Sequence, residues 1–208
     1  MTFPYANNAP PRSNDRVRIL DQEVLSDDWF VLKKTRFEIP RRDGRRQIVS
    51  RETYDRGNGA VLLLFNAHRG TVILTRQFRF PAFANGSDDG MLIEACAGLL
   101  DGDDAESAIR REVAEETGFK VTAPRKLFEA YMSPGSVTEK LHFFAAAYDD
   151  TDRHSAGGGD AAEGEDIEVL EFALADALQM ISSGAIEDAK TIMLLQYAAL
   201  HGLRALVP

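Results

Sequence analysis

The sequence of 208 residues has a single cysteine, Cys96, so no disulfide can form within the chain. Disulfides are rare in reducing compartments, so this count favours a cytoplasmic protein. Cys96 lies in the apolar run LIEACAGLL. That setting predicts a small buried side chain rather than a reactive thiol.

Long apolar runs are missing as well. No stretch approaches the roughly 20 apolar residues of a membrane-spanning helix. The N-terminal stretch MTFPYANNAPPRSNDR is polar and has no hydrophobic region of the kind that secretory signals carry. We therefore expect no membrane partner, and we expect residues 1–16 to form a disordered tail.

The chain also lacks an excess of positive charge, since its formal net charge is −9. This balance argues against a nucleic-acid partner, because such proteins carry a basic surface. An acidic protein that binds an anionic small molecule needs local arginines and a bound cation for that purpose.

The hydrophobic pattern predicts an α/β fold with a mixed central sheet. Apolar and alternating runs precede PRRDGRRQ, whose Asp43-Gly44 pair is a hairpin signal, so we expect an N-terminal antiparallel β segment over residues 17–52. Residues 53–208 would form the main domain. Its expected strands include GAVLLLFN, GTVILTRQFRF, MLIEACAG, KLFEAYM, EKLHFFAAAYDD and IEVLEFAL, and helical spacing follows in ADALQMISSG and AIEDAKTIMLLQYAALHGL.

One helix is expected from about Asp104 to Thr117, with Gly118 at its end. Asp103 and Glu106 have the spacing of a capping box. The apolar stripe that would face the sheet consists of Ala105, Ala108, Ile109 and Val113.

The same helix brings three carboxylates together, because Glu115 and Glu116 lie three and four residues after Glu112. Like charges at this spacing cost about 0.2–0.5 kcal/mol per pair on an exposed helix. A hard divalent cation would offset that cost, since Mg²⁺ binds carboxylate oxygens together with water and phosphate. The alternative is an ordinary solvated helix face, on which Arg110 and Arg111 balance the acids.

The surrounding stretch GLLDGDDAESAIRREVAEETGF resembles the Nudix box. Gly98 opens the motif, and its second half is matched by Arg111, Glu112, Val113, Glu115, Glu116, Gly118 and Phe119. One residue is missing before Arg111, and Asp103 or Asp104 stands where the motif has an isolated glutamate. The missing residue falls in the loop before the helix, so the carboxylate face is unchanged.

Further segments resemble the GDP-mannose pyrophosphatase branch of the Nudix hydrolases, among them LTRQFR, RKLFEAYMSPGSVTEKLHFF, EDIEVLE and DAKT. This resemblance implies an α/β/α Nudix sandwich and a homodimer that shares its N-terminal strands. It also implies Mg²⁺- or Mn²⁺-dependent hydrolysis of a nucleotide sugar, with GDP-mannose giving GMP and mannose 1-phosphate. ADP-ribose or another ADP-sugar is the alternative substrate, and a non-catalytic nucleotide sensor is a distant alternative.

The resemblance also assigns roles by position. The metal would be held by the Ala97 carbonyl, Glu112, Glu116 and Glu165. Glu115 would lie near it, Arg111 would orient a glutamate through a bidentate pair, and Glu165 or Glu139 would accept the proton. Substrate contacts would come from Trp29, Arg51, Glu52, Arg79, Gly98, Leu99, Glu139 and Lys190.

Each role has a simpler alternative. Trp29 could be a core or interface aromatic, and Arg79 and Lys190 could be surface residues. The Gly-rich loop at 153–166 could be a plain linker instead of a lid that carries Glu165. Ser50 departs from the family pattern, where a basic residue is expected, and the loop is longer by about two residues.

Overall fold

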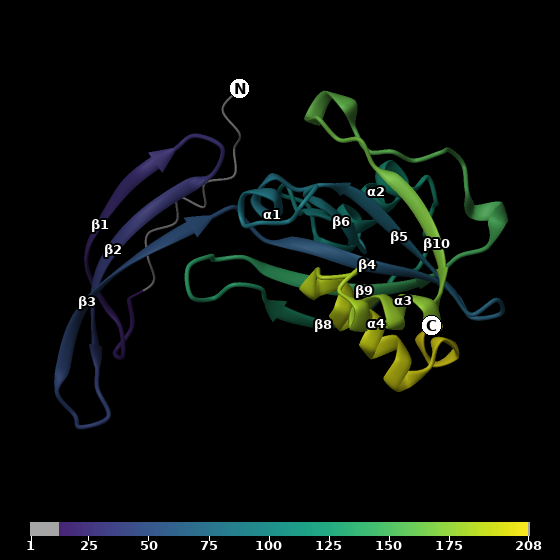
Figure 1. Ribbon diagram of the computed structural model, residues 1–208. Coiled ribbons are helices and arrows are strands. Elements are labelled where there is room, and N and C mark those ends of the chain that lie inside the picture. Colours follow the sequence, from purple (N-terminus) through teal and green to yellow (C-terminus); the bar gives the residue numbers. More distant parts are fainter. Residues whose placement is uncertain (1–12, 208) are drawn as a thin grey trace. The chain divides into compact units, whose positions relative to one another are not determined.

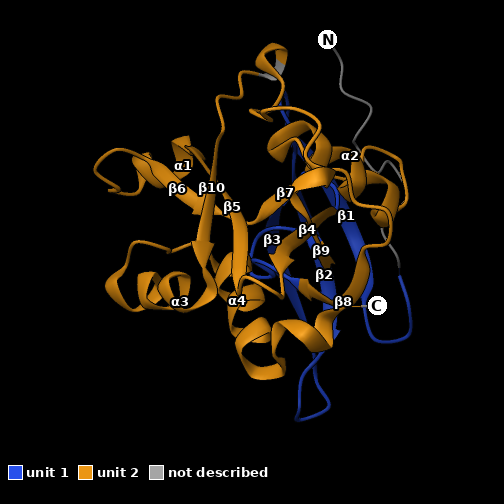
Figure 2. Cartoon of the chain, turned by 90° about the vertical axis from the view of Figure 1, so that its right-hand side faces the viewer, with its two compact units in different colours: residues 1–58, 131–140 blue, residues 59–130, 141–208 orange. Residues whose placement is uncertain are grey.

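A computed structural model describes residues 13–207 and shows two compact units (Figure 2). Unit 1 consists of the described residues up to Asn58 together with Tyr131–Lys140. Unit 2 consists of Gly59–Ala130 and the described residues from Leu141 onward. Most of the tail predicted at residues 1–16 lies outside the described residues. Within the part of the chain that the structure describes, no helix is long and apolar enough to cross a membrane.

Unit 1 contains an antiparallel sheet of three strands, β1 (Arg18–Asp27), β2 (Val31–Pro40) and β3 (Arg46–Asp55), in the order β1-β2-β3. The predicted N-terminal β segment is therefore present. Tyr131–Lys140 joins this unit through a bridge between Tyr54 and Val137.

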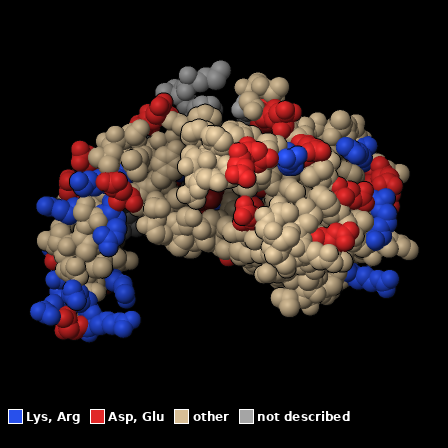
Figure 3. Space-filling view, in the orientation of Figure 1, with Lys and Arg blue, Asp and Glu red and all other residues tan. Residues whose placement is uncertain are grey.

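The hairpin between β2 and β3 turns at the predicted position. Gly44 has a φ of +82°, and the Asp43 side chain accepts a hydrogen bond of 3.0 Å from the backbone N–H of Arg45. Figure 3 shows the lysines and arginines that gather at this end of unit 1. The arginines of the hairpin are Arg41, Arg42, Arg45 and Arg46.

Unit 2 is built on a mixed seven-stranded sheet in the order β10-β5-β4-β9-β8, with β6 on β5 and β7 on β4. β4 runs parallel to β9 and antiparallel to β5 and β7. The strands are β4 (Gly59–Asn66), β5 (Thr71–Phe78), β6 (Met91–Glu94), β7 (Cys96–Leu99), β8 (Arg125–Tyr131), β9 (Lys140–Ala147) and β10 (Glu168–Ala173).

Helices cover both faces of this sheet (Figure 1). α2 packs on β4 and β7, and α4 packs on β4 from the other side, beside α3. The α-helices are α1 (Phe80–Ala84), α2 (Ala105–Thr117), α3 (Leu174–Ser183) and α4 (Ala189–His201), and the 3₁₀ turns are η1 (Asp150–Asp152), η2 (Ala161–Glu163) and η3 (Leu203–Leu206). The layering agrees with the predicted α/β/α sandwich.

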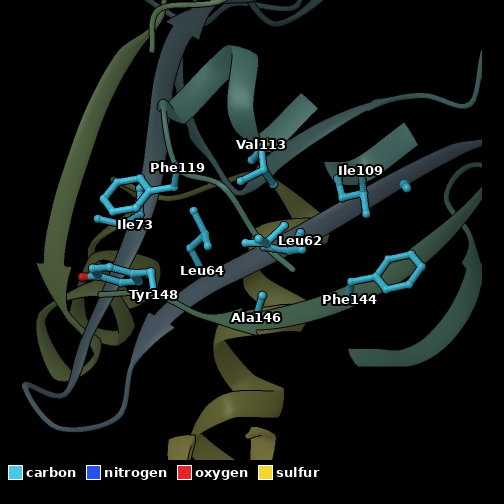
Figure 4. Close-up of a cluster of buried hydrophobic side chains, with 12 residues drawn as sticks. Leu62, Leu64, Ile73, Ile109, Val113, Phe119, Phe144, Ala146 and Tyr148 are labelled. Carbon is cyan, nitrogen blue, oxygen red and sulfur yellow. The ribbon is translucent and has the colours of Figure 1, made fainter. Parts of the chain in front are cut away.

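The core between α2 and the sheet is shown in Figure 4. Ile109 and Val113 of α2 point toward Leu62 of β4 and Ala146 of β9. The predicted apolar stripe of α2 is confirmed, because Ala108, Ile109 and Val113 are fully buried. This packing fixes α2 against the strands that carry the candidate site.

Three local predictions need correction. The N-cap of α2 is Asp104, whose side chain accepts from the N–H groups of Glu106 and Ser107, so the capping box proposed for Asp103 and Glu106 is wrong. The expected strand MLIEACAG is broken at Ala95 into β6 on β5 and β7 on β4. The expected strand GTVILTRQFRF ends at Phe78, because its last residue, Phe80, begins α1.

Candidate active site

The carboxylates of α2 differ strongly in environment. Glu116 is only 1% exposed, and it is among the largest fully buried side chains. The Glu112 side chain is mostly buried, whereas that of Glu115 is about half exposed. Glu112 and Glu116 therefore do not form an ordinary solvated acidic face, because charged side chains on such a face stay exposed to water.

Glu112 lies directly over Gly98 of β7. A Cβ atom at position 98 would come within 2.1 Å of the Glu112 side-chain carboxyl carbon. Only glycine leaves room for this contact. The register of β7 with β4, in which Gly98 lies opposite Ala60, sets the position of that gap.

Burial changes the protonation of both acids. Desolvation raises the pKa of Glu116 to about 8, with further increases from Glu112 and Glu165, although the Cys96 thiol and Arg79 act in the opposite direction. Desolvation likewise raises the pKa of Glu112 to about 7 against the opposing effect of Arg111. Neighbouring acids that resist ionisation are a feature of sites that hold a cation or transfer a proton.

Arg111 bridges three acids instead of forming a bidentate pair with one glutamate. Its Nη1 donates to Glu112 at 2.7 Å and to Glu115 at 3.4 Å, while its Nη2 donates to Asp101 at 3.3 Å. The bidentate prediction is thus wrong. Arg111 thus holds Glu112 and Glu115 in place.

The loop that carries Glu165 is attached to the end of α2. The N–H of Gly158 donates to the Glu116 carbonyl at 2.9 Å, and the N–H of Gly159 donates to the Glu115 carbonyl at 3.1 Å. The Glu165 side chain accepts from the N–H of Asp160 at 2.9 Å. The loop is therefore anchored by helix carbonyls that lack partners within the helix. Its role as a lid remains a prediction.

A divalent cation fits this group of acids. The Glu116 Oε2 atom is buried and has no hydrogen-bond partner among the described residues. Carboxylate oxygens are the ligands that Mg²⁺ takes in proteins, and a cation would relieve the repulsion among Glu112, Glu116 and Glu165. Within residues 13–207, however, no three His, Cys, Asp or Glu side chains are already gathered closely enough to hold a metal ion.

Arg79 and Lys190 lie in a second charged group of unit 2. Arg79 precedes α1, and its Nε donates to Glu94 at 2.7 Å. Lys190 of α4 donates to the other oxygen of Glu94 and, at 2.8 Å, to Asp188. The charges of Glu116 and Glu165 act on Arg79, so this group adjoins the acids of α2. Neither cation is therefore an isolated surface residue.

Comparison with known proteins identifies the family. The NUDIX domain model matches residues 55–195, and the model of the GDP-mannose pyrophosphatase NudK N-terminal domain matches residues 16–54. The chain belongs to the Nudix family. This result confirms the resemblance inferred from the motif around α2.

Two relatives cover nearly the whole chain of this Nudix protein. A protein of Pectobacterium atrosepticum named GDP-mannose pyrophosphatase is 55% identical over 89% of this chain and 95% of its own. One of Klebsiella pneumoniae with the same name is 51% identical over 90% of this chain and 93% of its own. A crystal structure of an ADP compounds hydrolase shares the fold, with a TM-score of 0.67 at 19% identity over 92% and 99% of the two chains.

The remaining predicted residues of this Nudix protein divide between the units. Ala97, Gly98 and Leu99 lie together on β7 in unit 2. The predicted residues of unit 1 are Trp29, Arg51, Glu52 and Glu139. A role for these four in the site of unit 2 remains a prediction.

The unit 1 residues have few contacts that fix a function. Trp29 is 70% exposed and meets Phe30 edge-on at 6.3 Å between ring centroids. Arg51 donates to the carbonyl of Ser50, and Glu139 lies 3.4 Å from Arg56. The exposure of Trp29 excludes a core role within the single chain and leaves substrate stacking or an interface.

Sequence reasoning missed Glu94, Asp188 and Asp101. Glu94 could have been found, because a charged residue inside the apolar run LIEACAG must be buried with a partner. Asp188 could have been read as an N-cap from the stretch EDAKT. The contact of Asp101 with Arg111 depends on the turn before α2 and leaves no signal in the sequence.

Proposed function

We propose that this Nudix protein is a cytoplasmic, Mg²⁺-dependent hydrolase that cleaves the diphosphate of GDP-mannose into GMP and mannose 1-phosphate. The observation that carries the proposal is its 55% identity, over 89% of the chain, to a relative named GDP-mannose pyrophosphatase. The buried acids of α2 support the chemistry. Mn²⁺ is the alternative ion.

Glu112, Glu116, Glu165 and the Ala97 carbonyl would hold the cation, which supplies positive charge to the diphosphate and acidifies bound water. Glu112 and Glu116 carry raised pKa values in the metal-free chain, so binding of the ion would release protons. Arg111 would keep Glu112 and Glu115 in place during this exchange.

Arg79 would bind the diphosphate, because a guanidinium matches phosphate oxygens geometrically. The reaction needs a water oxygen to bond to phosphorus while the bridging P–O bond breaks and one proton leaves the water. Glu165 is the favoured acceptor of that proton. Its charge acts on both Glu112 and Glu116.

A panel of nucleotide sugars with Mg²⁺ tests the proposal, with products separated by chromatography. We expect GMP and mannose 1-phosphate from GDP-mannose at a higher kcat/KM than any product from ADP-ribose. Preference for ADP-ribose would overturn the substrate assignment. No turnover of any nucleotide sugar would favour the non-catalytic sensor.

The acids are tested by Glu116→Gln, which keeps the size of the side chain and removes its charge. We expect a loss of turnover of at least about 100-fold at saturating Mg²⁺. The matched control is Glu106→Gln on the exposed first turn of the same helix, which should keep wild-type turnover. Wild-type turnover of Glu116→Gln would refute the role of α2.

A further inference from the structure

Glu94 is a buried carboxylate held between two cations. It ends β6, and its side chain is 4% exposed. One oxygen accepts from the Nε of Arg79 at 2.7 Å, and the other accepts from the Nζ of Lys190. A buried carboxylate requires partners for both oxygens, and here each oxygen is bound by one cation.

The Lys190 side of this group is rigid. Asp188 accepts from Lys190 at 2.8 Å through one oxygen, and from the hydroxyl of Thr191 at 2.6 Å through the other. The same hydroxyl accepts from the N–H of Ala95, the residue after Glu94, at 2.6 Å. These bonds form a closed ring that ties the start of α4 to the break between β6 and β7.

The charge of Lys190 is stable in this ring. Burial works against the ammonium group, but Glu94 and Asp188 more than offset that effect and raise the pKa of Lys190. Glu94 is therefore paired with a charged lysine that Asp188 also binds.

The Arg79 side is left open. Only the Nε edge of its guanidinium is bound to Glu94, and its two terminal nitrogens have no hydrogen-bond partner in the described part of the chain. The Arg79 side chain is 40% exposed, and the negative charges of Glu116 and Glu165 act to raise its pKa. A guanidinium that is held by its Nε atom can donate from its two terminal nitrogens to an anion.

Stability alone is a poor reason for such a group, because buried ion pairs often contribute little net stabilisation. We propose that Glu94 is a positioning residue, which aims the free nitrogens of Arg79 at the substrate diphosphate. Lys190, Asp188 and Thr191 fix Glu94 for this task. The inference rests on the proposed function, because it takes a nucleoside diphosphate as the ligand.

A double-mutant cycle on kcat/KM tests this role. We expect Glu94→Gln to lower kcat/KM roughly 10- to 100-fold, with most of the change in KM, because a misplaced binding group loses productive geometry. In an Arg79→Ala background the same change should have almost no further effect. A merely structural role would instead give independent, multiplying losses.

Controls separate positioning from folding. Glu171→Gln removes another arginine-paired carboxylate of the same sheet, 3.3 Å from Arg69, and should leave kcat/KM unchanged. Urea unfolding should show that Glu94→Gln is folded at the assay temperature. If Glu94→Gln is unfolded, Glu94→Asp replaces it in the cycle, because this change keeps the charge but moves it by one methylene group. Its effect on kcat/KM should likewise almost disappear in the Arg79→Ala background.

The failure of this inference can be told from failure of the proposed function. The cycle is repeated on the Kd of GDP, measured by calorimetry in EDTA, where no turnover is needed. Independent effects of Glu94→Gln and Arg79→Ala on both kcat/KM and Kd would overturn the Glu94 role while GDP-mannose hydrolysis stands. Coupled effects on Kd in a wild-type protein that hydrolyses no GDP-mannose would overturn the function and keep the role.

Discussion

Glu116 shows how one residue can be unfavourable for folding and useful for binding. Its carboxyl group is buried, one of its oxygens has no partner among the described residues, and its pKa lies near 8. Burying a charged carboxylate at this position is unfavourable for folding. The cost of burying its charged form is offset when a cation binds, so metal binding and stability are linked.

This linkage predicts that the metal-free protein becomes less stable as pH rises. The folded pKa of Glu116, about 8, lies above its ordinary value of 4.5, and that of Glu112 is about 7. The folded state therefore holds more protons than the unfolded state between those pH values. The stabilising difference is complete below about pH 4.5 and is lost as pH approaches 8. We expect the free energy of unfolding in EDTA to fall by about 2–4 kcal/mol across this window.

Urea unfolding of the wild type, Glu116→Gln and Glu106→Gln at pH 5, 6, 7 and 8 measures this effect. Glu116→Gln should reduce the pH dependence, whereas Glu106→Gln should follow the wild type. At pH 8, added Mg²⁺ should restore to the wild-type protein the stability that it loses in EDTA. A stability that rises with pH in EDTA would contradict the buried, protonated state of Glu116.

At the scale of elements, α2 is held by hydrogen bonds at both of its ends. Its first turn is capped by Asp104, and its last carbonyls accept from the Gly-rich loop that leads to Glu165. Gly157 has a φ of +74°, and a Cβ atom there would lie 2.4 Å from the Glu116 carbonyl oxygen. Gly157 therefore allows the loop to approach the end of α2 closely.

We predict that Gly157→Ala detaches this loop from α2. The added methyl group overlaps backbone atoms, so the bond from Gly158 to Glu116 must break and Glu165 must move away from the acids. We expect turnover to fall by about 10-fold or more. Limited proteolysis should cut the loop faster, because its backbone bonds are lost.

Gly184→Ala is the matched control for this prediction. Gly184 has a φ of +80°, but a Cβ atom at this position would meet no other atom within 4 Å, so the variant carries the left-handed strain without the collision. That strain costs about 1–2 kcal/mol. We expect Gly184→Ala to lose stability and keep turnover per folded molecule. Equal turnover in the two variants would show that the loop anchor is not needed.

The sequence predicted α2 well because its pattern is local. The stripe of Ala108, Ile109 and Val113 repeats at helical spacing, and the family motif lies on the same segment. The break at Ala95 could not be predicted, since it arises where β4 and β5 diverge and each recruits a different strand. The ring around Glu94 joins residues nearly 100 positions apart, and no periodicity records such contacts.

At the scale of the whole molecule, the two units differ in how well they bury their side chains. Unit 2 contains almost the entire core. Among the described residues of unit 1, only Val31 and Thr35 are less than a tenth exposed, at 5% and 9%. A three-stranded sheet needs an apolar face packed against something to be stable. Unit 1 therefore lacks, within the single chain, the core that its strands would require.

We predict that unit 1 finds that core in a second copy of the chain, as a homodimer. Val24 of β1 is 54% exposed, and Trp29, Leu25 and Ile48 of the same unit are exposed as well. Exposed apolar side chains of this size in one small unit are typical of an interface. Val24→Lys places a charge among them and should convert the dimer to a monomer at micromolar concentration, as measured by sedimentation.

Glu23→Lys is the matched control, because Glu23 directly precedes Val24 on β1 and is already exposed and charged. It adds the same lysine without replacing an apolar side chain, so we expect it to remain a dimer. If Trp29, Arg51 and Glu52 complete the partner's site, Val24→Lys should also raise KM for GDP-mannose, and removal of residues 1–52 should do so more strongly. A wild-type monomer with full activity would refute the prediction, because unit 1 would then be stable without the second copy.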